Sequence, residues 1–291
     1  MKSLLLSKSL LISFLQFFIS LCLLFNAVSC EKEESILDLD EVAQEETDDE
    51  PDMESNDEPD TESNDEDESA DDTASDEEQT NDCPDATGFV FEENNGIVSI
   101  EFENNNFPDG WVLKNDVADA SGEGYMQWEG NASLGNPGNG MVVFPVRINT
   151  AGTYQFLWYS SYRKGDNGTE HNDSWLRFPD ADDFFGRKGN GSVVYPKGSG
   201  KEPNPNGSSS DGWFKIYRSG NNNAFKWQAS TSDNDGHDIF VTFSSPGVFL
   251  LEVSARSDFH AIDRLLLFQE DMNKNDSIEA ADVFSQKVTC D

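Results

Sequence analysis

Basic residues and histidine are scarce in this chain of 291 residues. Only 19 Lys or Arg stand against 57 Asp or Glu, there are three His, and the formal net charge is -38. Nucleic-acid binding and adsorption to anionic lipid both need clustered basic side chains to meet phosphates, so the composition argues against both. The three His form no metal-binding motif, and no nucleophile motif accompanies them, which disfavours an enzyme.

Cysteine is also rare, with four in the chain. Cys22 and Cys30 belong to the apolar N-terminal region, which leaves Cys83 and Cys290 as an isolated pair. They bracket the rest of the sequence almost to the residue. In an oxidising compartment we expect them to form a disulfide, which in the chain-entropy model stabilises so long a loop by about 4–5 kcal/mol. The alternative is two separate thiols.

The N-terminus has the pattern of an export signal. Lys2 and Lys8 precede an apolar run from Leu10 to Val28, which ends in Ala27-Val28-Ser29-Cys30. Small residues before a Cys resemble a bacterial lipoprotein signal, although Leu is usual where Ala27 stands. The resemblance implies a signal peptide over residues 1–29 and acylation of Cys30. A plain secretory signal or an N-terminal membrane anchor is the alternative.

The next residues, Glu31-Lys32-Glu33-Glu34, resemble the surface-export signal of Bacteroidetes lipoproteins. This implies a protein anchored by lipid in the outer membrane and displayed on the cell surface, where the lipid is its only link to the membrane. The alternative is a periplasmic location, with these residues serving only as the start of an acidic tail.

Residues 30–82 have the composition of a disordered tether. Between Glu31 and Asp82 there are 27 Asp or Glu and one Lys. The stretch Glu50–Asp57 is repeated with one substitution as Glu58–Asp65. Such a chain buries too little apolar surface to offset its ordering entropy, and its charges extend it. We interpret it as a spacer; loose cation buffering is the alternative.

The remaining residues, 83–291, show the pattern of an all-β domain. Short alternating apolar runs are separated by clusters of Gly, Pro, Asn and Asp, which predicts a β-sandwich or jelly roll. A polar stretch from Lys188 to Asp211 is expected to be a surface loop. The candidate strands are Gly88–Glu92, Gly96–Glu103, Tyr125–Glu129, Gly140–Ile148, Thr153–Tyr162, Ser174–Phe178, Trp213–Tyr217, Ala224–Ser230, Asp238–Phe243, Val248–Ala255 and Ala261–Phe268.

Three motifs together resemble carbohydrate-binding modules of families 6 and 35. They are the strand Gly96-Ile-Val-Ser-Ile-Glu-Phe-Glu103, the strand entry Ala151-Gly-Thr-Tyr154 and the segment His260-Ala-Ile-Asp-Arg-Leu-Leu-Leu267. The resemblance implies a galactose-binding-like jelly roll with a structural calcium ion held by Glu101, Glu103 and Asp263. The residues support this mapping, because Asp263 lies among apolar neighbours and a buried carboxylate needs a partner such as Ca²⁺. The alternative is neutralisation by Arg264 or Arg256.

The same resemblance implies a sugar site built from aromatic rings and hydrogen-bonding side chains. Trp158 and Trp227 lie in apolar strands and are assigned to the core, whereas Tyr162 and Trp175 border polar loops and are expected at the surface. His260 stands where the family often has Asn. Arg163 and Arg256 could contact an acidic sugar. The candidate ligand-binding residues are Tyr125, Tyr162, Arg163, His171, Asp173, Trp175, Arg256 and His260.

Two further acidic stretches could hold cations. Asp233–Asp238 fits either a small cation loop or a hairpin turn. The stretch from Asp271 to Asp282 resembles a single dockerin or EF-hand loop, with oxygens at Asp271, Asn273, Asn275 and Asp282, but it has Asp276 where Gly is expected. The alternative is a polar turn that leads into a short helix over Glu279–Val288.

These observations predict a non-catalytic, calcium-stabilised glycan-binding lipoprotein with a polysaccharide ligand and a possible co-encoded glycan-degrading enzyme or transporter. One alternative is an adhesion or assembly subunit that binds protein. The other is a jelly-roll polysaccharide lyase or hydrolase, for which His171, Tyr162 and Arg163 would supply the acid–base group.

Overall fold

The structure is a computed structural model, and it describes residues 87–289. The predicted signal peptide and the whole acidic tether precede this range. Cys30, Cys83 and Cys290 also lie outside the described residues, so lipidation and the disulfide stay predictions. Among the described residues, no helix has the length and apolar character needed to cross a membrane.

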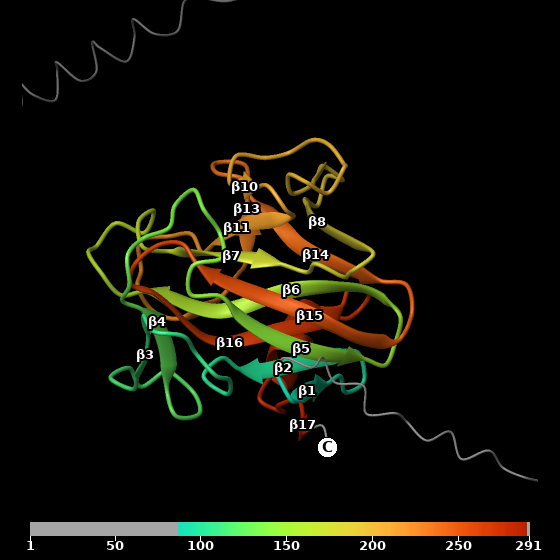
Figure 1. Cartoon of the computed structure of the whole chain (residues 1–291), viewed down its shortest axis with the longest axis horizontal. Coiled ribbons are helices and arrows are strands. Elements are labelled where there is room, and N and C mark those ends of the chain that lie inside the picture. The colour runs from blue at the N-terminus through green and yellow to red at the C-terminus, as the bar shows by residue number, and fades with distance from the viewer. Residues whose placement is uncertain (1–86, 290–291) are drawn as a thin grey trace, which may run out of the picture. The chain divides into compact units, whose positions relative to one another are not determined.

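The strands form two packed sheets, which one short strand joins into a single hydrogen-bonded system (Figure 1). The first contains β17 (Lys287–Thr289), β1 (Phe89–Glu92), β5 (Val142–Ile148), β15 (Gly247–Ala255), β7 (Asp173–Arg177) and β11 (Trp213–Tyr217), paired in this order. Only the β1–β5 pair in this sheet is parallel. The short strand β10 (Ser208–Ser209) pairs with β11.

The second sheet is centred on β16 (His260–Gln269). On one side β16 pairs with both β2 (Ile97–Glu101) and β4 (Tyr125–Trp128); on the other it pairs with β6 (Gly152–Tyr162). The order continues through β14 (His237–Phe243), β8 (Asp183–Arg187) and β9 (Val193–Val194). β3 (Trp111–Lys114) pairs with β4, and β12 (Lys226–Trp227) pairs with β6. β13 (Ser230–Thr231) pairs with β11 and β14, and so links the sheets.

The inner faces of the two sheets form one aromatic-rich core. Phe156 and Trp158 of β6 are fully buried, as are Phe144 and Val146 of β5 in the opposite sheet. Removing each such side chain from water contributes about 1.5–3 kcal/mol. A smaller cluster on the outer face of the second sheet, around Leu266, is covered by α2 (Lys274–Ala280).

The predicted all-β sandwich is confirmed, and so is the burial of Trp158, whereas Trp227 is only half-buried. The strand predicted over Ala224–Ser230 is wrong, because only β12 and the first residue of β13 form ladder pairs there. Five strands were not predicted: β3, β8, β17 and the two short strands β9 and β10, which lie within the stretch Lys188–Asp211 that was expected to be a loop. In β8 the adjacent Phe184 and Phe185 point to opposite faces, so the period of two is hidden.

A β-bulge sets the position of Asp263. The register of β16 against β6 shifts between Ile262 and Arg264, which leaves Asp263 out of the ladder with β6. On the other side of β16, the partner changes from β4 to β2 at the same point. The Asp263 carbonyl accepts from the Phe102 N–H at 2.8 Å, just beyond β2. The bulge therefore places Asp263 where the end of β2 meets the loop before β4.

Candidate functional site

Three acidic side chains gather around the loop that precedes β4. The Ser121 hydroxyl lies 2.8 Å from Glu101 Oε2 and 3.1 Å from Asp263 Oδ2, and the Ser121 N–H donates to Asp263. The Glu123 N–H donates to Glu103 Oε1 at 2.9 Å. Gly122 has a φ of +55°, and a Cβ added there would lie 2.4 Å from Glu103 Oε1, so a side chain at this position would be strained and would displace that carboxylate. The structure therefore places Glu101, Glu103 and Asp263 around the same loop.

Burial and mutual repulsion make this carboxylate cluster costly to ionise. Desolvation is the main reason that the pKa of Glu103 and that of Asp263 are each raised to about 7. Desolvation also raises the pKa of Glu101, although the Ser121 hydrogen bond opposes it. Each group feels at least one neighbouring carboxylate as a further unfavourable charge.

The arginines proposed as alternative partners only partly neutralise this cluster. Arg256 forms its ion pair elsewhere, with Asp173 at 2.6 Å. Arg264 Nε lies 3.7 Å from Asp263 Oδ2, but its Nη1 donates to Asp282 at 2.7 Å. Arg264 is therefore the nearby cation for the three carboxylates of the cluster, and it also pairs with a fourth carboxylate, that of Asp282.

The donor set of this cluster fits a hard cation. Glu101 Oε1 and Glu103 Oε2 are buried without a hydrogen-bond partner, and carboxylate oxygens are the ligands that Ca²⁺ prefers. Within residues 87–289, however, no three Asp, Glu, His or Cys side chains already converge in a geometry that could hold an ion. Calcium binding by Glu101, Glu103 and Asp263 stays a prediction.

A second candidate site lies at the end of the sandwich where β6, β11 and β15 finish. The loops there are joined by backbone hydrogen bonds, including Arg218 N–H to Asn172 O and Arg163 N–H to Phe259 O. Between them is a cleft of about 510 Å³, lined by Gly168, Thr169, Asn172, Lys215, Tyr217, Ser219, Gly220, Asp233 and Asn234. Its volume falls within the range of small-molecule sites.

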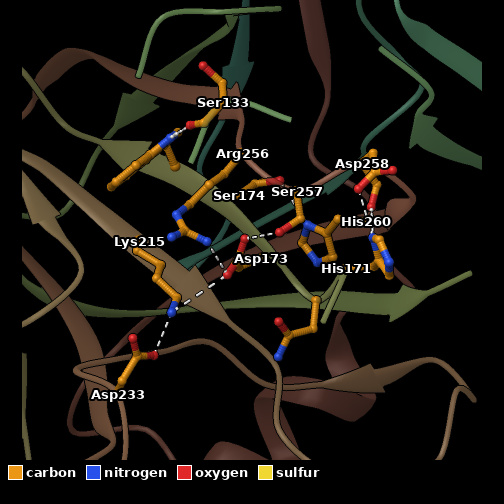
Figure 2. A network of polar contacts seen from close by, with 12 residues as sticks. Ser133, His171, Asp173, Ser174, Lys215, Asp233, Arg256, Ser257, Asp258 and His260 are labelled. Carbon is orange, nitrogen blue, oxygen red and sulfur yellow. Dashed lines mark hydrogen bonds and ion pairs between the residues drawn. The ribbon is translucent and has the colours of Figure 1, made fainter. Parts of the chain in front are cut away.

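The cleft wall is fixed by a charged network (Figure 2). Asp173 is buried and accepts from Arg256 at 2.6 Å and from the Ser257 hydroxyl at 2.5 Å. Lys215 Nζ points between Asp173, at 3.7 Å, and Asp233, at 2.5 Å. Because Asp233 belongs to the turn before β14, the Lys215 contact ties that turn to β11.

The polar groups of the cleft are held in fixed orientations. Both amide hydrogens of Asn172 are donated to the carbonyls of Gly168 and Arg218, so its oxygen is left to accept. The Tyr217 hydroxyl donates to Ser232 O, and this contact fixes the ring. Sequence reasoning missed Asn172, Lys215 and Tyr217 as site residues. The available signal was a Lys and a Tyr on the same face of an otherwise apolar strand.

Most of the predicted ligand-binding residues lie at this end, but several are buried beneath the loops. The expectation that Tyr162 and Trp175 are at the surface is wrong, since their exposures are 1% and 3%. The Tyr162 hydroxyl donates to Asn221 O, and the Trp175 indole N–H to Ser133 O. Tyr125 is also buried and donates to Asp116. Polar loop neighbours misled the prediction, because these rings point under the loops.

The two predicted arginines have different surroundings. Arg256 is committed to Asp173 and also lies over the Trp175 ring at 5.2 Å. Arg163 is half-buried; its Nη1 lies 3.4 Å from Asn223 O, and its guanidinium is 5.8 Å from the centre of the Tyr125 ring. Neither side chain lines the cleft.

The three histidines are all engaged within the protein. His260 is fully buried beside the Ser174 hydroxyl at 2.8 Å, and burial lowers its pKa to about 3. His171 Nδ1 contacts Asp258 Oδ1 at 2.8 Å, and His237 contacts Asp235 O and Ser192 Oγ. The suggested acid–base group of Tyr162, His171 and Arg163 is not assembled, because Tyr162 and His171 hydrogen-bond elsewhere.

The two other acidic stretches have structural partners. In the hairpin turn between β13 and β14, Asp233 pairs with Lys215 and Asp235 with Lys188. The helix predicted over Glu279–Val288 is instead α2, seven residues long and further upstream. Asn273 caps it by accepting from the N–H groups of Asn275 and Asp276. Asp282 pairs with Arg264, so the second proposed loop is a capped helix in this structure.

Comparison with known proteins gives weak similarities. No model of a known protein family matches the sequence, and neither does any curated protein. A Podospora anserina GH26-CBM35 β-(1,4)-mannanase matches at a TM-score of 0.36 and 12% identity, over 62% of this chain and 29% of that one. A ruminal GH26 endo-β-1,4-mannanase matches at a TM-score of 0.27 and 13% identity, over 60% of this chain and 26% of that one. The chain thus spans less than a third of either enzyme.

Proposed function

We propose that residues 83–291 form a non-catalytic glycan-binding domain whose ligand lies in the cleft lined by Lys215 and Tyr217. The observation that carries this proposal is the lining itself. It combines one aromatic ring with amide, hydroxyl, ammonium and carboxylate groups, all held by contacts inside the protein. A sugar has both apolar C–H faces and hydroxyl groups that donate and accept, so it matches such a surface.

In this proposal a calcium ion stabilises the scaffold away from the ligand. Glu101, Glu103 and Asp263 would hold it, together with oxygens that the loop around Ser121 supplies. The ion would offset the repulsion among these buried carboxylates and fasten β2 to β16. An acylated Cys30 and the acidic tether would display the domain on the outer membrane, facing the cell exterior.

Affinity electrophoresis of the full mature chain tests the proposal, using gels with neutral or acidic polysaccharides and with calcium or EDTA. Retarded migration on at least one polysaccharide, without release of reducing ends or unsaturated products, is the expected result. Product formation would instead identify a polysaccharide lyase or hydrolase. Unretarded migration on every polysaccharide would favour the alternative of an adhesion or assembly subunit.

A further inference from the structure

Four buried polar atoms without hydrogen-bond partners belong to side chains that point into the core between the two sheets. They are Trp158 Nε1, Ser160 Oγ, Arg218 Nε and His260 Nε2, and each is buried with no hydrogen bond inside residues 87–289. The four side chains are at most 1% exposed. Buried polar groups are nearly always satisfied, so several unsatisfied ones in one place indicate a bound water or ion.

The strand register explains why these side chains meet. Trp158 and Ser160 alternate along β6, so both point from the same face as the core residue Phe156. His260 of β16 pairs with Tyr162, two residues further along β6, and its ring is 5.2 Å from that of Trp158. Arg218, which follows β11 of the opposite sheet, places its guanidinium 5.3 Å from the centre of the Tyr162 ring.

Arg218 is a buried cation without a counter-charge. It forms no ion pair within the described residues; its Nη atoms reach only the carbonyls of Gly220, at 3.5 Å, and Ala224, at 3.4 Å. Burial lowers its pKa, and no carboxylate opposes that effect. An unpaired buried charge costs several kcal/mol, so a partner of negative charge is expected.

The four unsatisfied groups can all donate. Trp Nε1 and Arg Nε are donors only, and a serine hydroxyl can turn to donate. His260 is neutral because burial lowers its pKa to about 3; when Nδ1 accepts from Ser174, the ring hydrogen is on Nε2. A water molecule has two lone pairs, fewer than four donors require, whereas a halide ion accepts from several directions and also neutralises Arg218.

We propose that Trp158, Ser160, Arg218 and His260 bind a small monovalent inorganic anion, chloride in ordinary saline, between the two sheets. The bound anion fixes Arg218. Arg218 in turn holds the carbonyls of Gly220 and Ala224, in the loop whose Ser219 and Gly220 line the cleft. The site thus supports one wall of the cleft, but its existence does not depend on the identity of the cleft ligand.

Thermal unfolding of the full mature chain in chloride, bromide or gluconate at constant ionic strength tests this site. Chloride and bromide should raise Tm, by roughly 3–5 °C for each tenfold increase above the dissociation constant, whereas gluconate should not. Ser160→Ala removes one donor with little change in volume, and Trp158→Phe removes another by means of a smaller ring; both should weaken the chloride dependence, whatever they do to the Tm itself. Trp175→Phe, which loses an indole N–H bonded to Ser133 O, is the matched control and should keep it.

A crystal soaked in bromide gives the direct test. An anomalous peak within hydrogen-bond distance of Trp158 Nε1 and Arg218 Nε supports the proposal. The proposal is overturned by density there that bromide leaves unchanged, which would be water only, or by a Tm that is the same in chloride, bromide and gluconate. Both readouts are independent of glycan binding, so this site and the proposed function can fail separately.

Discussion

Asp173 and Arg256 form an ion pair at 2.6 Å at the end of the sandwich that carries the cleft. The Ser257 hydroxyl completes the coordination of Asp173, and Lys215 reaches it from the cleft side. Both Asp173 and Arg256 were expected to bind the ligand. Their contacts tie β7 to the end of β15 and, through Lys215, to β11; of these three side chains only Lys215 lines the cleft.

Asp173→Asn should destabilise the domain by roughly 3 kcal/mol, because Arg256 would be left without its buried partner. Urea unfolding of the variant measures this loss. Glu270→Gln is the control, since it breaks the more exposed Arg187–Glu270 pair and should cost less than about 1 kcal/mol. Equal small losses in the two variants would show that the Asp173 pair is not a stabilising contact.

Calcium should stabilise the domain, and chelation by EDTA should lower its Tm, if the carboxylate cluster holds an ion. Asp263→Asn should remove the calcium response because it deletes the acid at the bulge. Asp109→Asn, which changes an exposed acid in a loop, should leave the response intact. A calcium-induced shift of the same size in both variants would place the ion elsewhere.

Without calcium, stability should fall as the pH rises from about 5 to 8. The folded-state pKa values of Glu103 and Asp263 are raised to about 7 from ordinary values of 4.5 and 3.8. Between the unfolded-state and the folded-state pKa values, the folded protein holds protons that the unfolded chain has released. Protonation of Glu103 and Asp263 therefore contributes fully to the free energy of unfolding at low pH, and this contribution is lost as the pH rises through 7. Urea unfolding in EDTA at pH 5 and pH 8 measures this change in the free energy of unfolding. Higher stability at pH 8 would contradict raised pKa values for Glu103 and Asp263.

Calcium should reverse that pH dependence. An ion binds the ionised carboxylates, so its affinity rises as they lose their protons. The increase in the free energy of unfolding caused by calcium should therefore be larger at pH 8 than at pH 5. Titration of the EDTA-stripped protein with calcium at both pH values checks this, and a pH-independent calcium effect would speak against ligation by Glu103 and Asp263.

The sequence was sufficient to predict the sandwich and the meeting of Glu101 with Asp263. Alternating apolar residues define the strand of Glu101, a nearly continuous apolar run defines that of Asp263, and a carboxylate among apolar neighbours needs a partner. It was insufficient for the cleft. Tyr162 and Trp175 border polar loops, yet their rings turn inward, since side-chain direction at a strand end depends on register and on which loop folds over it. Tyr217 lies in an apolar strand and pairs with Asp173 of β7 and Ser230 of β13, yet its ring is half-buried at the cleft, which the pattern of the strand does not indicate.

Isothermal titration of Tyr217→Ala against the polysaccharide that retains the wild-type chain tests the central claim most directly. We expect a loss of affinity of about tenfold or more, which corresponds to about 1.4 kcal/mol, while cooperative urea unfolding shows that the variant is still folded. Trp175→Phe, an aromatic change beneath the same loops, should bind as the wild type does. Unaltered affinity in Tyr217→Ala, or an equal loss in both variants, would contradict glycan binding in this cleft.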